Sequence, residues 1–207
     1  NGTSEKTTPV DSDVLSLLDS AASWAMKKLS WSNIKATLKL YFDQIYLAPS
    51  GSGTSLTGIT KIAQVVLTES SADFSTAATI PYDATIPQNT EGAEYITASI
   101  TPNSATSILE IEAYLMIGAN NGGIFIAALF VDSASNALQT GALTVSGITM
   151  NSYNFKTRVV SGSTNARTYK LRIGSNGVTI YVNRSSGTAD LFGSSVSSFI
   201  RITEILP

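Results

Sequence analysis

Beyond residue 59 the sequence breaks into short runs of β-branched, aromatic and aliphatic residues that turn formers separate. Runs of this length at close spacing are typical of an all-β sandwich or barrel, because each can cross a sheet once before the chain turns back. The predicted strands are 61–68, 94–100, 107–117, 124–131, 143–150, 153–160, 168–173, 178–182 and 198–205. We therefore predict a mainly β fold with antiparallel sheets.

Two turn signals stand out among these runs. Residues 113–131 carry no charge and are long enough to cross a membrane, but the Asn-Asn-Gly-Gly run 120–123 interrupts them. Such turn formers between two β-rich runs favour a hairpin over a membrane span. The Asn-Gly pair 176–177 is the strongest short hairpin signal in the chain. We expect two hairpins here and no membrane insertion.

Residues 1–47 differ from the rest and hold both tryptophans. Their pattern predicts a small ββα module. Its strands are predicted at 14–18 and 25–29, with a polar turn at 19–23 and a helix from Ser30 or Ser32 to about Tyr46. The following residues, 48–58, are rich in Gly and Ser, which favours a flexible linker to a head domain at 59–207.

An apolar stripe runs along the predicted helix. Its members alternate spacings of three and four, like positions a and d of a heptad: Trp31, Ile34, Leu38, Tyr41 and Ile45. One interpretation is that the stripe is the face that the module buries against its own hairpin. The other is that it joins subunits, because Leu40 and Phe42 widen the apolar surface beyond a single face. The sequence leaves both open.

Composition narrows the possible functions. Only 14% of residues are charged, against about 25% in an average chain, which suggests that part of the surface is hidden against copies of the chain or a partner. The chain has no cysteine and no histidine, so disulfides, thiolate zinc sites, cysteine nucleophiles and histidine-assisted hydrolysis are excluded. We expect no cofactor and no enzymatic activity.

Charge is unevenly distributed along the predicted head. Residues 61–150 carry a net charge of −7 and residues 151–207 carry +5. Glu110 and Glu112 share one strand face, as Lys170 and Arg172 do on a later strand, so these four side chains are predicted to form cross-strand pairs. Since the total net charge is −2, nucleic acid is not an expected partner.

The same two glutamates are also the most suggestive candidates for catalysis. Neighbours two apart on a strand stand about 6.5–7 Å apart, near the carboxylate separation of inverting glycosidases. Any Glu-x-Glu strand gives that distance, however, and structural ion pairs outnumber catalytic ones. A structural role for Glu110 and Glu112 is the favoured interpretation.

Polar turns of the head are candidates for sugar binding, because Asn, Tyr and Arg side chains can bond hydroxyls and stack on sugar rings. The residues proposed from the sequence for receptor contact are Asn120, Asn121, Asn151, Tyr153, Asn176 and Arg184.

Two parts of the chain resemble known virion components. The motifs Thr8-Pro9-Val10-Asp11, Leu18-Asp19-Ser20-Ala21 and Lys27-Lys28-Leu29-Ser30-Trp31-Ser32-Asn33-Ile34 resemble a module of bacteriophage tail-fibre and related proteins. The stretch 85–92, residues 99–102, 128–132 and the closing 198–204 look like the terminal β domain that often follows that module. The resemblance implies a homotrimeric jelly-roll head similar in shape to tumour-necrosis-factor and C1q heads.

The resemblance also implies a function. It suggests a virion appendage that binds a host-surface glycan or protein and contacts other virion proteins, with no fixed catalytic residues to carry over. Because the sequence begins with Asn1, it also fits the C-terminal portion of a longer fibre. Two alternatives remain open: a tailspike-like polysaccharide depolymerase and a purely structural decoration or collar protein.

Overall fold

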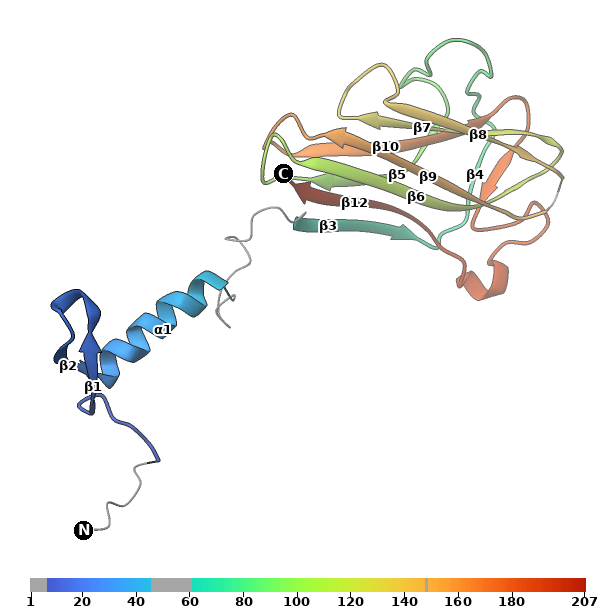
Figure 1. The fold of residues 1–207 in the computed structure, drawn as a ribbon. Helices are drawn as coiled ribbons and strands as arrows, with labels where there is room; N and C mark the ends of the chain where they lie inside the picture. Colours follow the sequence, from blue (N-terminus) through green and yellow to red (C-terminus); the bar gives the residue numbers. More distant parts are fainter. Residues whose placement is uncertain (1–6, 46–60, 148) are drawn as a thin grey trace. The chain divides into compact units, whose positions relative to one another are not determined.

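The computed structural model describes residues 7–45, 61–147 and 149–207 (Figure 1). The chain divides into two compact units, Asn1–Ile59 and Thr60–Pro207, here called unit 1 and unit 2. The predicted linker 48–58 and the boundaries at 47 and 59 lie outside the described residues. Each unit is therefore described by itself.

Unit 1 is the ββα module that the sequence predicts. Strands β1 (Val14–Asp19) and β2 (Ala25–Ser30) form an antiparallel hairpin, and helix α1 (Trp31–Ile45) follows directly. The hairpin turns through a 3-10 segment, Ser20–Ala22, where the Ala21 amide donates to Asp19 Oδ1 at 2.9 Å. Ser30 starts the helix, because its hydroxyl accepts from the Asn33 amide at 3.3 Å, as an N-cap does.

Unit 2 is a sandwich of two antiparallel sheets that face each other (Figure 1). The four-stranded sheet has the order β5 (Ala93–Ile100), β10 (Arg167–Ser175), β7 (Gly123–Val131), β8 (Gln139–Val145). The six-stranded sheet has the order β3 (Lys61–Ser70), β12 (Ser198–Leu206), β6 (Ile108–Ala119), β11 (Ile180–Val182), β4 (Phe74–Thr76), and β9 (Asn151–Val160) also pairs with β6. A short 3-10 segment, η3 (Leu191–Ser194), precedes β12.

The route of the chain makes this sandwich a jelly roll. From β5 the chain crosses to β6 in the other sheet, returns to β7 and β8, crosses to β9, returns to β10 and crosses again to β11 and β12. The central strands of both sheets are therefore paired with strands distant in sequence, as in two interlocked Greek keys. The predicted fold class is confirmed.

The two predicted hairpins are wrong. The turns at 120–123 and 176–177 each join strands of different sheets, β6 to β7 and β10 to β11. β6 pairs instead with β12 and β9, and β7 pairs with β10 and β8. Both strands thus lie in the interior of their sheets, where apolar residues on the inner face are buried. The two corners brace each other, since the Thr179 amide donates to Asn120 Oδ1 at 3.0 Å.

Most other predicted strands match the structure within a few residues, but β8 runs over Gln139–Val145 and not over the predicted 143–150, and the short strand β4 was not predicted. The sequence placed Gly141 outside the strand. In the structure this glycine lies inside β8, where a Cβ atom would clash with the Tyr153 hydroxyl oxygen. Glycine is needed there because the Tyr153 side chain packs directly against the backbone of β8. The strand continues through Gly141 and does not end at it.

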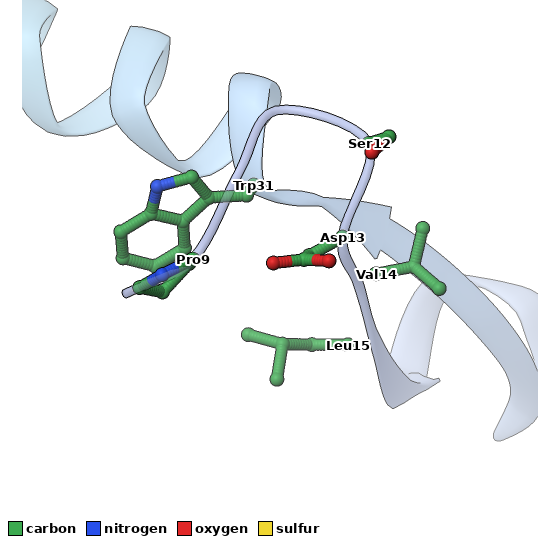
Figure 2. Close-up of a pocket in the computed structure, with 6 residues that line it drawn as sticks. All are labelled: Pro9, Ser12, Asp13, Val14, Leu15 and Trp31. Carbon is green, nitrogen blue, oxygen red and sulfur yellow. The ribbon is translucent and has the colours of Figure 1, made fainter. Parts of the chain in front are cut away.

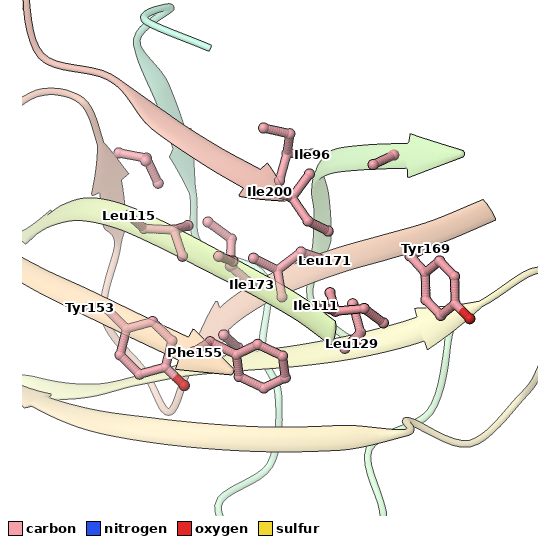
Figure 3. Close-up of a cluster of buried hydrophobic side chains, with 14 of the residues drawn as sticks. Ile96, Ile111, Leu115, Leu129, Tyr153, Phe155, Tyr169, Leu171, Ile173 and Ile200 are labelled. Carbon is pink, nitrogen blue, oxygen red and sulfur yellow. The ribbon is translucent and has the colours of Figure 1, made fainter. Parts of the chain in front are cut away.

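The core fills the space between the two sheets. Figure 3 shows aliphatic side chains of both sheets packed with the rings of Tyr153, Phe155 and Tyr169. Leu109, Ile111 and Leu171 are fully buried in it. Burying side chains of this size contributes about 1.5–3 kcal/mol each to folding.

A second, smaller cluster covers the outer face of the four-stranded sheet. Residues 77–92, here called the strap, lay Ile80 against Ile126 and Phe130 of β7. Gly174 permits this approach, since a Cβ atom there would stand 2.7 Å from the Ala78 carbonyl oxygen. Arg172 ties the strap to β10 by donating to two of its carbonyl oxygens, at 2.8 and 2.7 Å.

The predicted pairing of Glu110 and Glu112 with Lys170 and Arg172 is also wrong. The glutamates lie on β6 and the bases on β10, in different sheets. The prediction failed because the sequence pattern does not show which sheet a strand joins. The acidic and basic parts of unit 2 still interleave through other partners. The ion pairs that Asp73, Glu94, Glu110, Glu112 and Asp132 form all join an acid from 61–150 to a base from 151–207.

Candidate functional site

One end of unit 2 lies away from the start of β3 and is called here the distal end (Figure 1). Lys61 pairs with Leu206, and Ile205 with Ile108, so β3 begins where β12 ends and β6 begins. β6 then runs to Ala119 at the opposite end. The corners after β6 and β10 and the connection from β8 to β9 therefore all lie at the distal end.

The structure brings most of the predicted receptor residues together at this end. They are Asn120 and Asn121 in the β6–β7 corner, Asn176 in the β10–β11 corner, Asn151 at the start of β9 and Arg184 after β11. Several of their side chains hold the loops themselves: Asn121 Oδ1 accepts from the Gly122 amide at 2.8 Å, and Asn151 Nδ2 donates to the Thr149 carbonyl at 3.2 Å. The distal surface is thus polar and held in shape by its own asparagines.

Arg184 adds a cation to this surface. Its guanidinium carbon stands 5.3 Å from the centre of the Tyr181 ring, and Nη1 lies 3.8 Å from Asp73 Oδ2. Nε donates to the Ser185 carbonyl at 3.2 Å. The stacked, partly exposed guanidinium is fixed in place and can bond an acceptor presented by a partner.

Tyr153 is a correction to the sequence-based set. β9 starts at Asn151, so Tyr153 takes an inward position of the strand and is only 8% exposed. Its ring packs edge-on against Phe125, with centroids 5.0 Å apart, and burial raises the pKa of its hydroxyl. Because it belongs to the core, Tyr153 cannot contact a receptor.

Asn183 supports the distal end and was missed from the sequence. It is buried, with φ of 59°, and its amide nitrogen donates to the Ser70 carbonyl oxygen at 2.8 Å. Ser198 donates to its Oδ1 at 2.7 Å. Asparagine tolerates the left-handed backbone here and joins β3, β11 and β12 through one side chain. Its only sequence signal is an asparagine directly after a short β-rich run.

Unit 1 shows what the apolar stripe of the helix contacts. Trp31 and Ile34 are half-buried, whereas Leu38 and Tyr41 are 45% and 56% exposed. Ile45 is the last residue of α1, and its side chain lies outside the described residues. The hairpin therefore covers only the first turns of the stripe, and Leu38 and Tyr41 face outward.

Unit 1 has no interior of its own among its described residues, since none of them is buried. Its exposed large apolar residues are Val10, Val14, Leu15, Leu17, Leu18, Trp24, Met26, Leu38, Leu40, Tyr41 and Phe42. An open groove of about 550 Å³ lies in this surface, lined by Pro9, Ser12, Asp13, Val14, Leu15 and Trp31. Figure 2 shows the Trp31 ring beside Pro9. Exposed apolar surface on this scale marks an interaction site.

Unit 2 carries a smaller apolar surface on the outside of its six-stranded sheet. Four residues in cross-strand register form a row over β3, β12, β6 and β9: Ile62, Ile205, Ile108 and Val160. Ile62 and Val160 are 65% and 60% exposed. Val65 and Leu67 extend the row along β3, and both are more than half exposed. This apolar row is a second candidate contact surface.

Glu110 and Glu112, the possible carboxylate pair for glycoside hydrolysis, both form ion pairs. Glu110 accepts from Lys156 at 2.8 Å and from Arg158 at 2.6 Å, and these bonds hold its pKa below the ordinary value. Glu112 is paired with Arg201. A general acid needs a raised pKa, and the cations beside Glu110 act in the opposite direction. In the part of the chain that the structure describes, no cluster of acidic side chains could hold a metal ion.

No described helix combines the length and the apolar character that crossing a membrane requires.

A scan against family models and a search of curated proteins both gave no match. Among solved structures, the chain is similar to a CBM4 carbohydrate-binding module (TM-score 0.30, 9% identity, 44% of this chain and 57% of that one). It is also similar to VP2 of the infectious bursal disease virus subviral particle (0.35, 12%, 70% and 40%). A third is the enzymatically active domain of tailspike protein 4 of bacteriophage CBA120 (0.26, 18%, 66% and 20%). The chain thus spans 20–57% of the lengths of these proteins, and its strand order alone defines the fold.

Proposed function

We propose that the protein is a self-assembling virion appendage of the tail-fibre type, whose unit 2 binds a glycan or protein on the host surface. The observation that carries the proposal is the contrast within the chain: unit 2 has a complete core, while the described residues of unit 1 include none that is buried. A module without an interior is stabilised by burying its apolar surface against other chains.

The proposed assembly is a homotrimer, the state implied by the tail-fibre resemblance. The exposed part of the α1 stripe, at Leu38 and Tyr41, and the apolar row of unit 2 are its proposed subunit contacts. Removing such surfaces from water stabilises a complex by about 25 cal/mol per Å² of apolar area. Other virion proteins are the proposed partners for apolar surface of unit 1 that the trimer leaves uncovered.

The distal end is the proposed receptor-binding surface, since it lies opposite the start of β3 and presents fixed polar groups. The proposed contacts are Asn120, Asn121, Asn151, Asn176 and Arg184. The proposed activity is binding without catalysis, because the Glu110 and Glu112 carboxylates are neutralised by bases.

Binding of labelled protein to bacterial cells tests this function. Asn121→Trp places a bulky ring on the exposed distal corner, and we expect cell binding to weaken at least about tenfold, because a hot-spot contact is worth about 1.4 kcal/mol or more. Asn165→Trp is the matched control, since Asn165 is equally exposed but lies in the β9–β10 connection at the opposite end. Absence of binding that cell-surface extract competes would contradict the receptor function and favour a decoration or collar protein.

A further inference from the structure

We infer that a polar pocket on the outer face of the four-stranded sheet binds a neutral sugar ring through its vicinal hydroxyl groups. The inference rests on the proposed function: it adds to the distal end a second contact with the host surface, on another face of unit 2, and gives the ligand of that contact a chemical class. The pocket encloses about 340 Å³ and is lined by Asn89, Glu94, Phe130, Asp132, Ser133, Lys170 and Arg172. That volume falls within the range of about 300–1,000 Å³ usual for small-ligand sites.

The pocket is built where three segments meet. Lys170 lies directly opposite Phe130 on β7, and Arg172 lies opposite Glu94 on β5, so all four point to the outer face. The strap contributes Asn89 and the turn after β7 contributes Ser133, and the two segments are joined, since the Asn89 backbone amide donates to the Ser135 carbonyl oxygen at 2.8 Å. The site therefore depends on the jelly-roll strand order and on no single motif.

Two of its ion pairs differ from the close ones elsewhere in unit 2. Glu94 Oε2 stands 3.9 Å from Lys170 Nζ and 3.8 Å from Arg172 Nη1. By comparison, Lys156 approaches Glu110 to 2.8 Å. A hydrogen bond between such groups needs about 2.7–3.2 Å, so Glu94 bonds neither base directly, and a hydroxyl or a water can bridge each gap. The carboxylate and both cations can therefore each bond a ligand hydroxyl.

Other polar atoms of the pocket are also available. Within the described residues, Ser133 Oγ and Asn89 Oδ1 have no hydrogen-bond partner, whereas Asn89 Nδ2 donates to the Ala134 carbonyl oxygen at 3.1 Å. The pocket thus offers acceptors at Glu94 and Asn89 and donors at Lys170 and Arg172. A vicinal diol matches this combination, because each hydroxyl both donates and accepts.

The surrounding groups hold the pocket in position before a ligand arrives. Arg172 is anchored to the strap by its other two nitrogens. Asp132 is anchored by Arg167 at 2.8 Å and by the Thr168 amide at 2.8 Å. The lining carries two acids and two bases, so it favours a neutral ring over an anionic one.

Saturation-transfer NMR on the full chain tests the pocket, with methyl glucoside, methyl galactoside, methyl mannoside and sodium glucuronate as probes. We expect a saturable signal from at least one neutral glycoside, with a Kd of about 1 mM, as a ligand of about 12 non-hydrogen atoms allows. Lys170→Met keeps the aliphatic stem and removes the donor, which should weaken binding about tenfold. Lys156→Met is the matched control on the opposite sheet and should leave binding unchanged.

Ser133→Ala is a second pocket variant on an exposed turn, chosen because it leaves β10 intact, and it should weaken binding several-fold. The inference is overturned if no neutral glycoside gives a signal, if glucuronate binds more tightly than the neutral probes, or if Lys170→Met and Ser133→Ala bind as wild type does. Cell binding that survives both variants would overturn the pocket and leave the proposed function standing. Glycoside binding without any cell binding would support the pocket and contradict the proposed function.

Discussion

Units 1 and 2 are both rich in apolar side chains, yet they use them in opposite ways. In unit 2 two sheets face each other, so Leu109, Ile111 and Leu171 are fully buried. In unit 1 one hairpin and one helix give too few layers to enclose anything, and Trp24 and Met26 are 68% and 74% exposed. A layer needs a second layer to bury its apolar face. Unit 2 finds that layer within the chain, and unit 1 is proposed to find it in other chains.

Separating the units should give the largest contrast. Residues 61–207 alone are expected to stay folded on dilution and to unfold cooperatively, because their core is enclosed within the chain. Residues 1–47 alone are expected to lose their helix on dilution, because an isolated 15-residue helix is only marginally stable in water. Circular dichroism over a concentration series measures both. A helix signal in 1–47 that does not change on dilution would show that unit 1 is stable as a monomer.

A pair of leucines sharpens the same contrast in the intact chain. Leu171→Ala should lower the free energy of unfolding of unit 2 by about 2–5 kcal/mol, because it opens a cavity in the core. Leu40→Ala should change that transition by less than about 0.5 kcal/mol, since Leu40 is 63% exposed in unit 1. Urea denaturation followed by circular dichroism tests this. Equal effects of the two changes would remove the distinction between the units.

Glu204 makes the stability of unit 2 depend on pH. This buried carboxylate on β12 accepts from Ser107 Oγ at 2.6 Å, from the Asn103 amide at 2.7 Å and from Gln64 Nε2 at 2.7 Å. Burial alone would raise its pKa, but the hydrogen bonds outweigh burial and lower the pKa to about 2 from an ordinary 4.5.

Because the folded-state pKa is the lower one, the stabilisation is fully present above about pH 4.5 and is lost as the pH falls toward 2. The loss should reach about 3 kcal/mol, and urea titrations at pH 6 and pH 2.5 measure it. Glu204→Gln should be less stable at pH 6 and lack this part of the pH dependence. Glu69→Gln, on the exposed face of β3, serves as control. An unchanged pH profile in Glu204→Gln would refute the role of the network.

The smallest effect is expected at the surface ion pairs of unit 2. Glu112→Gln removes the partner of Arg201 on the outer face of the six-stranded sheet. The cost should be less than about 1 kcal/mol and should disappear in about 1 M salt, because exposed pairs are weak and screened. Urea denaturation at low and high salt provides the measurement. A loss of several kcal/mol that persists in salt would mean that charge pairing, and not the core, dominates the stability of unit 2.

The sequence predicts where the strands and the helix lie better than it predicts which strands pair with each other. Strand positions follow from local patterns, which is why β9 and β12 fall close to their predicted ranges. Sheet membership depends on contacts distant in sequence, so the turns at 120–123 and 176–177 were wrongly assigned to hairpins. The pairing of Glu110 with Lys170 failed for the same reason.

The candidate sites show the same limit. The sequence could place asparagines in turns, and most of them lie together at the distal end, but Tyr153 lies within β9, on the inward face that it shares with Phe155. The sugar pocket has no sequence signal, because Asn89, Glu94, Ser133 and Lys170 come from separate segments. Only the jelly-roll strand order brings them together.

The mass of the full chain in solution tests the central claim most directly. Sedimentation equilibrium at micromolar concentration should give three times the chain mass of 21.8 kDa. Leu38→Asp puts a charge on the exposed stripe and should shift the mass toward one chain, whereas Thr37→Asp, about 100° around the helix, should leave it unchanged. A wild-type mass of 21.8 kDa under these conditions would contradict the claim that unit 1 completes its core in other chains.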